Sequence, residues 1–203
     1  MNERKSKTTW LVQIAMLTAI ILILAFTPLG YIRTGGLEIT LIVIPVAVGA
    51  VILGPVGGMI LGAVFGITSF IQCFGMSPFG AMLLSISPVK TFITCVVTRT
   101  LLGWLTGLIY QGMKKISRNK SLNTVVANLC CPFMNTLFFM SCIVIFFYQT
   151  DYIQGFVSML GAANPFLFVL GFVGINGLVE ALLCFVVGSA ITRALMAALN
   201  SYK

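Results

Sequence analysis

The run TTWLVQIAMLTAIILILAFTPLG, residues 8–30, is long and apolar enough to decide the fold class. A helix that crosses the hydrocarbon core of a bilayer needs about 20 predominantly apolar residues, and this run supplies them before Pro28 and Gly30 end it. Within the run, AMLTA places Ala15 and Ala19 four residues apart, on one stripe of the helix. Either this stripe packs against helices of the same chain, or another protein docks there.

The composition of the whole chain indicates the same environment. Hydrophobic residues make up 59% of the 203 residues and charged residues 8%, whereas a soluble domain carries about 25% charged residues. Because lipid offers no hydrogen bonds to the backbone, only helices or a closed barrel can span it, and these apolar runs are too continuous for barrel strands. We therefore predict an all-α, multi-pass integral membrane protein with a single domain over residues 1–203.

The basic residues predict the orientation of this domain. We expect six spans, at about residues 9–27, 39–53, 56–72, 88–112, 123–148 and 165–193. With six spans, nine of the 12 basic residues fall on one side: Arg4, Lys5, Lys7, Lys114, Lys115, Arg118, Lys120, Arg193 and Lys203. The positive-inside rule makes that side cytoplasmic, so both termini are expected in the cytoplasm. The net charge of +8 is then a topology signal, and no nucleic-acid partner is expected.

The residue types that are scarce argue against several kinds of chemistry. The chain has no histidine and only four acidic residues, which disfavours zinc, nickel and haem sites and paired-carboxylate catalysis. Neither a GxxxxGK[ST] phosphate loop nor a GxSxG nucleophile motif is present. We therefore predict that the protein is not an enzyme and holds neither a metal nor a cofactor.

Two features of the predicted spans concern helix packing. Gly58, Gly62 and Gly66 are spaced four apart, which lets helix backbones approach closely in lipid, either as fixed packing or as a moving contact. Arg99 and Glu180 fall at membrane depth, where an ionisable group costs about 3 kcal/mol at a helix centre. We expect these two to form an ion pair within the bundle, with a role in transport, in contact with the substrate, as the alternative.

A second group of polar residues falls in the outer half of the predicted bundle. Basic groups there suit a carboxylate, and amides suit hydroxyl groups and an amide bond. The same side chains could instead snorkel to the interface or join helices to one another. The candidate substrate-binding residues are Lys90, Arg33, Gln72, Asn135, Asn164 and Asn176.

Three motifs carry a resemblance to a known family. AMLTA lies on the first span, IPVAVGAVILGPVGGMILGAVFG covers the next two, and ISPVKTF enters the fourth. With them, the chain resembles the substrate-binding S components of energy-coupling factor (ECF) vitamin transporters of the bacterial cell membrane. The resemblance extends over nearly the whole length.

The resemblance implies partners and roles. Small residues four apart on the first helix of an S component dock against the transmembrane T component, so Ala15 and Ala19 are implied as the docking stripe. Two separate ATPases supply the energy of this ABC-type importer. The first outer loop, PLGYIRTGGLE (28–38), is implied as a lid over the vitamin, and Gly30, Gly35 and Gly36 would give it freedom to move.

The identity of the cargo follows from charge and from the resemblance together. Basic groups with amides favour a small anionic vitamin, and the sequence looks most like the pantothenate-type members, so pantothenate is the expected substrate. Riboflavin, folate and biotin remain alternatives. A stand-alone secondary transporter and an intramembrane enzyme are the alternatives outside the family.

Overall fold

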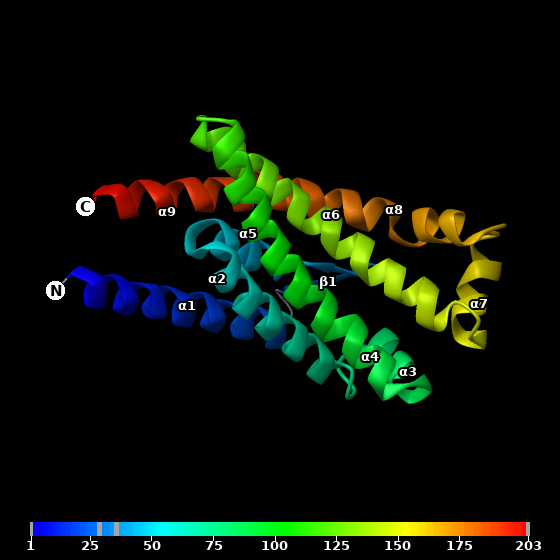
Figure 1. Ribbon diagram of the computed structural model, residues 1–203. Helices are drawn as coiled ribbons and strands as arrows, with labels where there is room; N and C mark the ends of the chain where they lie inside the picture. Colours follow the sequence, from blue (N-terminus) through cyan, green and yellow to red (C-terminus); the bar gives the residue numbers. More distant parts are fainter. Residues whose placement is uncertain (1, 28–29, 35–36, 202–203) are drawn as a thin grey trace.

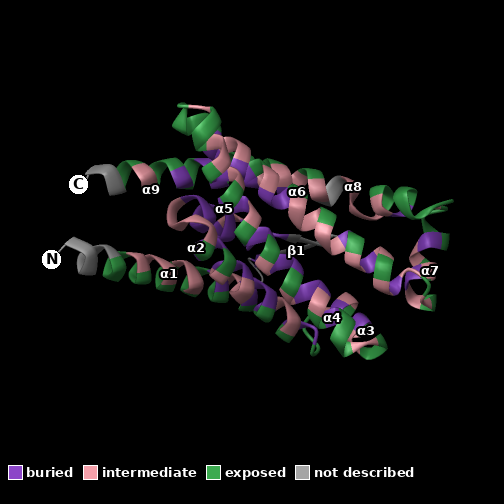
Figure 2. Ribbon diagram, viewed as in Figure 1, coloured by how far each residue is buried: buried purple, intermediate pink, exposed green. Residues whose placement is uncertain are grey.

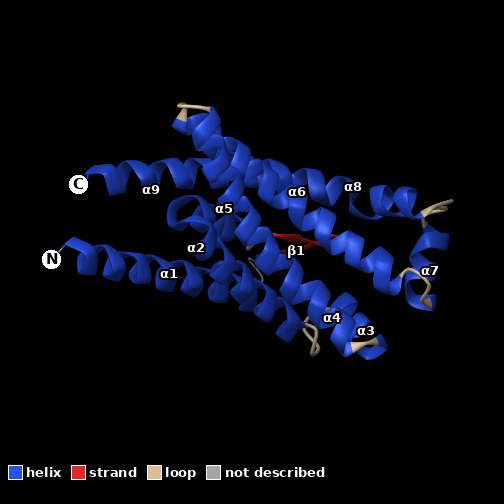
Figure 3. Ribbon diagram, in the orientation of Figure 1, coloured by secondary structure: helices blue, strands red, loops and turns tan. Residues whose placement is uncertain are grey.

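The protein is a bundle of long helices with one small β-hairpin (Figure 3). The computed structural model describes residues 2–27, 30–34 and 37–201, with side chains for residues 7–27, 30, 40–174 and 177–198. In chain order the elements are α1 (Asn2–Phe26), β1 (Tyr31–Thr34), β2 (Leu37–Thr40), α2 (Val43–Gln72), α3 (Pro78–Ile86), α4 (Pro88–Phe92), the π-helical segment η2 (Ile93–Val97), α5 (Thr98–Ile116), α6 (Lys120–Phe147), α7 (Asp151–Met159), α8 (Pro165–Leu183), the π-helical segment η3 (Cys184–Gly188) and α9 (Ser189–Ser201).

Five helices within the described ranges are long and apolar enough to cross a membrane. They are Lys7–Phe26, Val43–Gln72, Pro88–Ile116, Lys120–Phe147 and Gly177–Ala198, and a shorter apolar helix spans Pro165–Gly174. The protein is therefore a multi-pass membrane protein. The two ends of the chain lie at the same end of the bundle (Figure 1).

The predicted second and third spans are the two arms of α2. Gly54 interrupts the helix with φ 80° and ψ −174°, a conformation that suits glycine, and Pro55 follows it. A Cβ built on Gly58 would lie 2.8 Å from the Cβ of Ala50, although residues eight apart in a straight helix are separated by about 12 Å. The chain therefore folds back on itself at Gly54, as the ribbon shows (Figure 1).

The second arm of α2 packs backbone to backbone against α5. A Cβ added to Gly62 would meet the carbonyl oxygen of Arg99 at 2.2 Å, and one added to Gly58 would meet that of Gly103 at 2.3 Å. One turn further on, a Cβ added to Gly66 would lie 2.7 Å from the Cα of Val96 in η2. The glycine stripe predicted from the sequence is thus an internal packing surface, as small residues at this spacing allow in lipid.

The all-α prediction is confirmed, and the structure adds one small hairpin in the loop that follows α1. Tyr31–Thr34 and Leu37–Thr40 form an antiparallel hairpin in which Tyr31 pairs with Thr40 and Arg33 with Glu38. Two short runs with β-branched residues, joined by Gly-Gly, are a recognised hairpin pattern, and tertiary context overrides the expectation of a plain loop. Gly35 and Gly36 lie outside the described residues, whereas Gly30 packs against the backbone of Leu24, where a Cβ would meet the carbonyl oxygen at 2.0 Å.

The face of α1 that carries AMLTA does not pack within the chain. Ala15 and Ala19 are both exposed, as is Met16 between them. The buried contacts of α1 come from its C-terminal part, through Ile21 and Ala25. Figure 2 shows the contrast between this exposed helix and the buried centre of α2 and α5. Internal packing therefore does not explain the small residues of this stripe.

The glycine contact predicts a position-dependent cost of adding a single methyl group. Gly62→Ala should destabilise the protein by about 1–3 kcal/mol, because the backbones of two helices must move apart to admit the Cβ. Thermal unfolding in detergent, followed by circular dichroism, measures the effect. Gly112→Ala is the matched control, because nothing lies within 4 Å of a Cβ at that position. Equal unfolding temperatures for the two variants would contradict the close contact.

Candidate functional site

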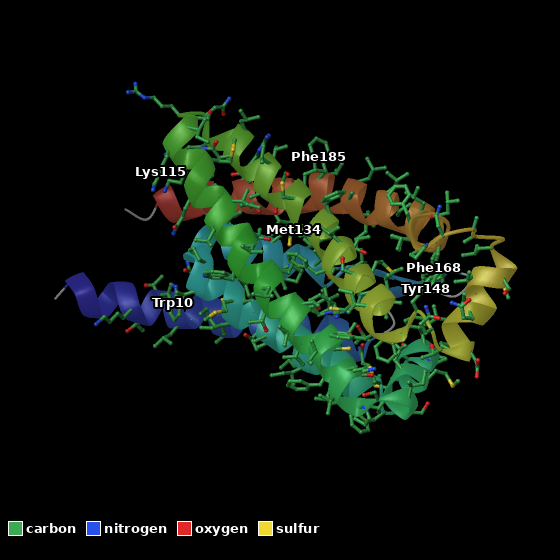
Figure 4. The ribbon with its side chains drawn as sticks, turned by 45° about the vertical axis from the view of Figure 1, so that its right-hand side comes forward. Trp10, Lys115, Met134, Tyr148, Phe168 and Phe185 are labelled. Carbon is green, nitrogen blue, oxygen red and sulfur yellow. The ribbon has the colours of Figure 1, made fainter. Side chains whose placement is uncertain are left out.

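A cavity of about 330 Å³ lies in the half of the bundle away from the chain termini. Its wall is built from the C-terminal end of α2, from α3, from η2 and the start of α5, and from α6, α7 and α8, with Thr40 of β2. Figure 4 shows the same end of the molecule, where Tyr148 and Phe168 lie together, far from Trp10 and Lys115. Elements from most of the chain therefore converge on one cavity.

Arg99 enters this cavity from the start of α5, directly after η2. A π-helical turn shifts the hydrogen-bond pattern of the helix, and such turns are frequent at functional sites. Here Nη1 of Arg99 donates to the backbone carbonyls of Thr94 and Cys95, both at 3.2 Å. The side chain therefore lies back along its own helix and is held in one orientation.

The guanidinium of Arg99 is buried without an acidic partner. Arg99 is 8% exposed, and its Cζ lies 4.7 Å from the ring centroid of Phe65 and 5.3 Å from that of Phe139. The faces of the two aromatic rings stabilise the cation by cation–π interaction. Nε is buried with no hydrogen-bond partner, and no carboxylate oxygen among the described side chains lies within 4.0 Å of the guanidinium. The ion pair that the sequence predicted with Glu180 is not formed.

Glu180 of α8 lines the same cavity and takes its hydrogen bonds elsewhere. It is 6% exposed, and Oε1 accepts a hydrogen bond from Nδ2 of Asn135 at 3.1 Å. The backbone of Thr40 also hydrogen-bonds to this carboxylate. These two bonds join α6 and the hairpin to α8, which explains why Glu180 does not turn toward Arg99.

The rest of the wall is largely aromatic. The ring of Phe79 on α3 lies 5.9 Å from Tyr152 and 6.3 Å from Phe156, both on α7, and 5.8 Å from Phe172 on α8. The two short helices therefore close the cavity at the end of the bundle with apolar rings. Burial raises the pKa of the Tyr152 phenol above its usual value, which keeps it neutral at physiological pH.

Two thiols also belong to the wall. Sγ of Cys73 lies 3.9 Å from Sγ of Cys95, and Cys73 donates to the carbonyl of Ser69 at 3.3 Å. Neither of these two thiols is part of a disulfide bond. Within the described ranges, no three His, Cys, Asp or Glu side chains are grouped as metal ligands would be.

The structure brings only part of the predicted binding set together. Gln72 and Asn135 line the cavity, although Gln72 donates its side-chain amide to the carbonyl of Ala25 on α1. Lys90 is exposed and its Nζ lies 3.5 Å from the carbonyl of Phe146, and Asn164 caps α8 by accepting from Leu167 N at 2.9 Å. Neither of these two lines the cavity. The side chains of Arg33 and Asn176 lie outside the described residues.

The sequence marks Arg99 and Glu180 as unusual but favours a pairing of the two with each other. The free-energy cost of an ionisable group at membrane depth marks both residues as unusual. The same cost applies whether the group pairs within the bundle or binds a ligand. The carbonyls of Thr94 and Cys95 that hold Nη1 of Arg99, and the bond from the backbone of Thr40 to Glu180, leave no pattern at the level of residue types. The aromatic closure by Phe79 likewise depends on how α3 folds over the bundle.

A comparison with family models gives one match. The chain matches the model described as ECF transporter, substrate-specific component, over residues 10–192. This range contains every residue that lines the cavity. No curated protein matches the chain. Because the matched range covers most of the 203 residues, the chain belongs to the family of ECF transporter substrate-specific components and is a transporter subunit, not an enzyme.

Proposed function

We propose that the protein captures a small carboxylate vitamin, with pantothenate as the best candidate, for import by an ECF transporter of a bacterial cell membrane. The observation that supports this most strongly is the buried guanidinium of Arg99, which lines the cavity without an acidic partner. An arginine binds a carboxylate through two parallel hydrogen bonds, and the fork of Nε and Nη2 is the part that makes no bond to the described residues. A ligand carboxylate would supply the missing countercharge.

The size of the cavity supports a small ligand. At about 330 Å³ it falls at the lower end of the range of about 300–1,000 Å³ that is usual for small-molecule sites. Pantothenate and biotin are smaller than riboflavin and folate, which makes the first two the better fits. Asn135 and the phenol of Tyr152 offer further hydrogen bonds to hydroxyl or amide groups of such a ligand.

The orientation and the partners are proposed from charge and exposure. The turn from α5 to α6 carries four basic residues: Lys114 and Lys115 in the last turn of α5, Arg118 in the loop and Lys120 at the start of α6. We place this turn in the cytoplasm with both termini, so that α2 contributes two of six spans. The cavity then faces the outer half of the membrane. Members of the family associate in general with a T component and ATPases, and we propose that the exposed stripe of Ala15 and Ala19 is where the T component docks.

Two basic residues are candidate partners for the carboxylate of the ligand. Lys90, predicted from the sequence, is exposed outside the cavity, whereas Arg99 lines it. Arg99→Met should weaken pantothenate binding by about 10- to 150-fold, because a charge-assisted hydrogen bond contributes about 1.5–3 kcal/mol. Lys90→Met should bind like the unmodified protein. Titration calorimetry on the purified protein in detergent gives both affinities.

Each of these variants is first checked for folding by its thermal unfolding temperature. Loss of binding in Lys90→Met with unchanged binding in Arg99→Met would reverse the assignment. If the unmodified protein binds none of pantothenate, biotin, riboflavin and folate, the vitamin assignment is wrong.

The docking stripe is tested by filling it. Ala15→Trp and Ala19→Trp should abolish vitamin uptake and co-purification with the T component, because small residues are what lets helices approach closely. Pantothenate binding by the isolated subunit should be unchanged, since this stripe lies on the outside of α1. Leu178→Trp, on the exposed side of α8, is the control for added bulk. Full vitamin uptake by Ala15→Trp and Ala19→Trp would show that the T component docks elsewhere.

A further inference from the structure

Glu180 is the second buried charged group of the cavity, and the family assignment gives it no role. It lines the cavity at 6% exposure, from a different helix than Arg99. Among the described side chains, no Lys or Arg nitrogen lies within 4.0 Å of its carboxylate. A buried carboxylate in this position is costly unless its oxygens are satisfied.

The partners of Glu180 use only part of the hydrogen-bonding capacity of its carboxylate. Nδ2 of Asn135 donates to Oε1, and the backbone of Thr40 donates as well. An ionised carboxylate offers about four acceptor positions, so two donors leave half of them open. Because Glu180 is part of the cavity wall, the remaining acceptor positions are accessible to a ligand.

The two charged groups therefore make the cavity chemically asymmetric. Arg99 offers N–H donors and a positive charge, with the rings of Phe65 and Phe139 around it. Glu180 offers acceptors and a negative charge, with the amide of Asn135 beside it. The two are not joined to each other by an ion pair, so each can bind a different part of one molecule.

We propose that Glu180 is a specificity-determining residue that accepts hydrogen bonds from hydroxyl groups at the end of the ligand remote from its carboxylate. The site then selects hydroxylated carboxylates and discriminates against carboxylates of the same shape that lack the hydroxyl groups. A site built to hydrogen-bond a hydroxyl group rejects the analogue without it, since the polar group of the protein is left buried and unpaired. The inference rests on the proposed function and extends it from the carboxylate to the opposite end of the ligand.

The test compares two ligands with two forms of the protein. The ligands are pantothenate and N-(3,3-dimethylbutanoyl)-β-alanine, which has the same skeleton and carboxylate but neither hydroxyl group. The proteins are the unmodified chain and Glu180→Gln, which keeps the shape and removes the charge, with Asp151→Asn on the exposed start of α7 as control. Affinities are measured by titration calorimetry in detergent.

The unmodified protein and Asp151→Asn should bind pantothenate at least about tenfold more tightly than the analogue. In Glu180→Gln this ratio should fall several-fold while the affinity for the analogue changes little, an effect that a purely structural role for Glu180 would not produce. If Glu180→Gln weakens the binding of both ligands by the same factor, the inference is wrong and Glu180 only joins helices to one another.

If Glu180→Gln does not fold, the two ligands on the unmodified protein still decide, because equal affinities there overturn the inference. If the unmodified protein binds neither ligand, the proposed function is wrong, and the inference that rests on it is wrong as well. Binding of both with an unchanged ratio in the variant overturns the inference alone.

Discussion

The backbone contact between the second arm of α2 and α5 is the constraint on which the rest of the structure depends. Gly62 touches the carbonyl of Arg99 itself, so the packing surface and the base of the candidate site are one feature. Two helices can approach this closely because the glycines of α2 place no Cβ at the contact. The contact sets where Phe65 lies under the guanidinium, and it fixes the helix from which Arg99 enters the cavity.

Two hydrogen bonds connect residues of the cavity wall to α1 and to the hairpin. Gln72 donates to the carbonyl of Ala25, near the end of α1, and the backbone of Thr40 connects β2 to Glu180. The helix with the exposed Ala15 and Ala19 stripe and the hairpin are therefore both bonded to residues that a ligand would contact. A ligand that moves Gln72 would act on α1, and one that moves Glu180 would act on the hairpin, which provides a physical route from an occupied cavity to the proposed docking stripe.

Much of the fold could be predicted from the sequence because its causes are local. Apolar runs of sufficient length, the Gly54–Pro55 break and the glycine stripe at Gly58 all leave a pattern in the residues themselves. The candidate site could be predicted only in part. Gln72 and Asn135 line the cavity as expected, but the choice between Lys90 and Arg99 depends on which side of its helix each presents and on the π-helical turn before Arg99. Such features arise from packing between distant segments and not from residue type.

In the proposed site, the buried Arg99 holds the carboxylate of the ligand. The most direct measurement compares pantothenate with pantothenol, in which a primary alcohol replaces the carboxylate, on the unmodified protein by titration calorimetry. We expect pantothenol to bind at least about tenfold more weakly than pantothenate, because the charge-assisted bonds to Arg99 are lost while the rest of the ligand is the same. Equal affinity for the acid and the alcohol would contradict it.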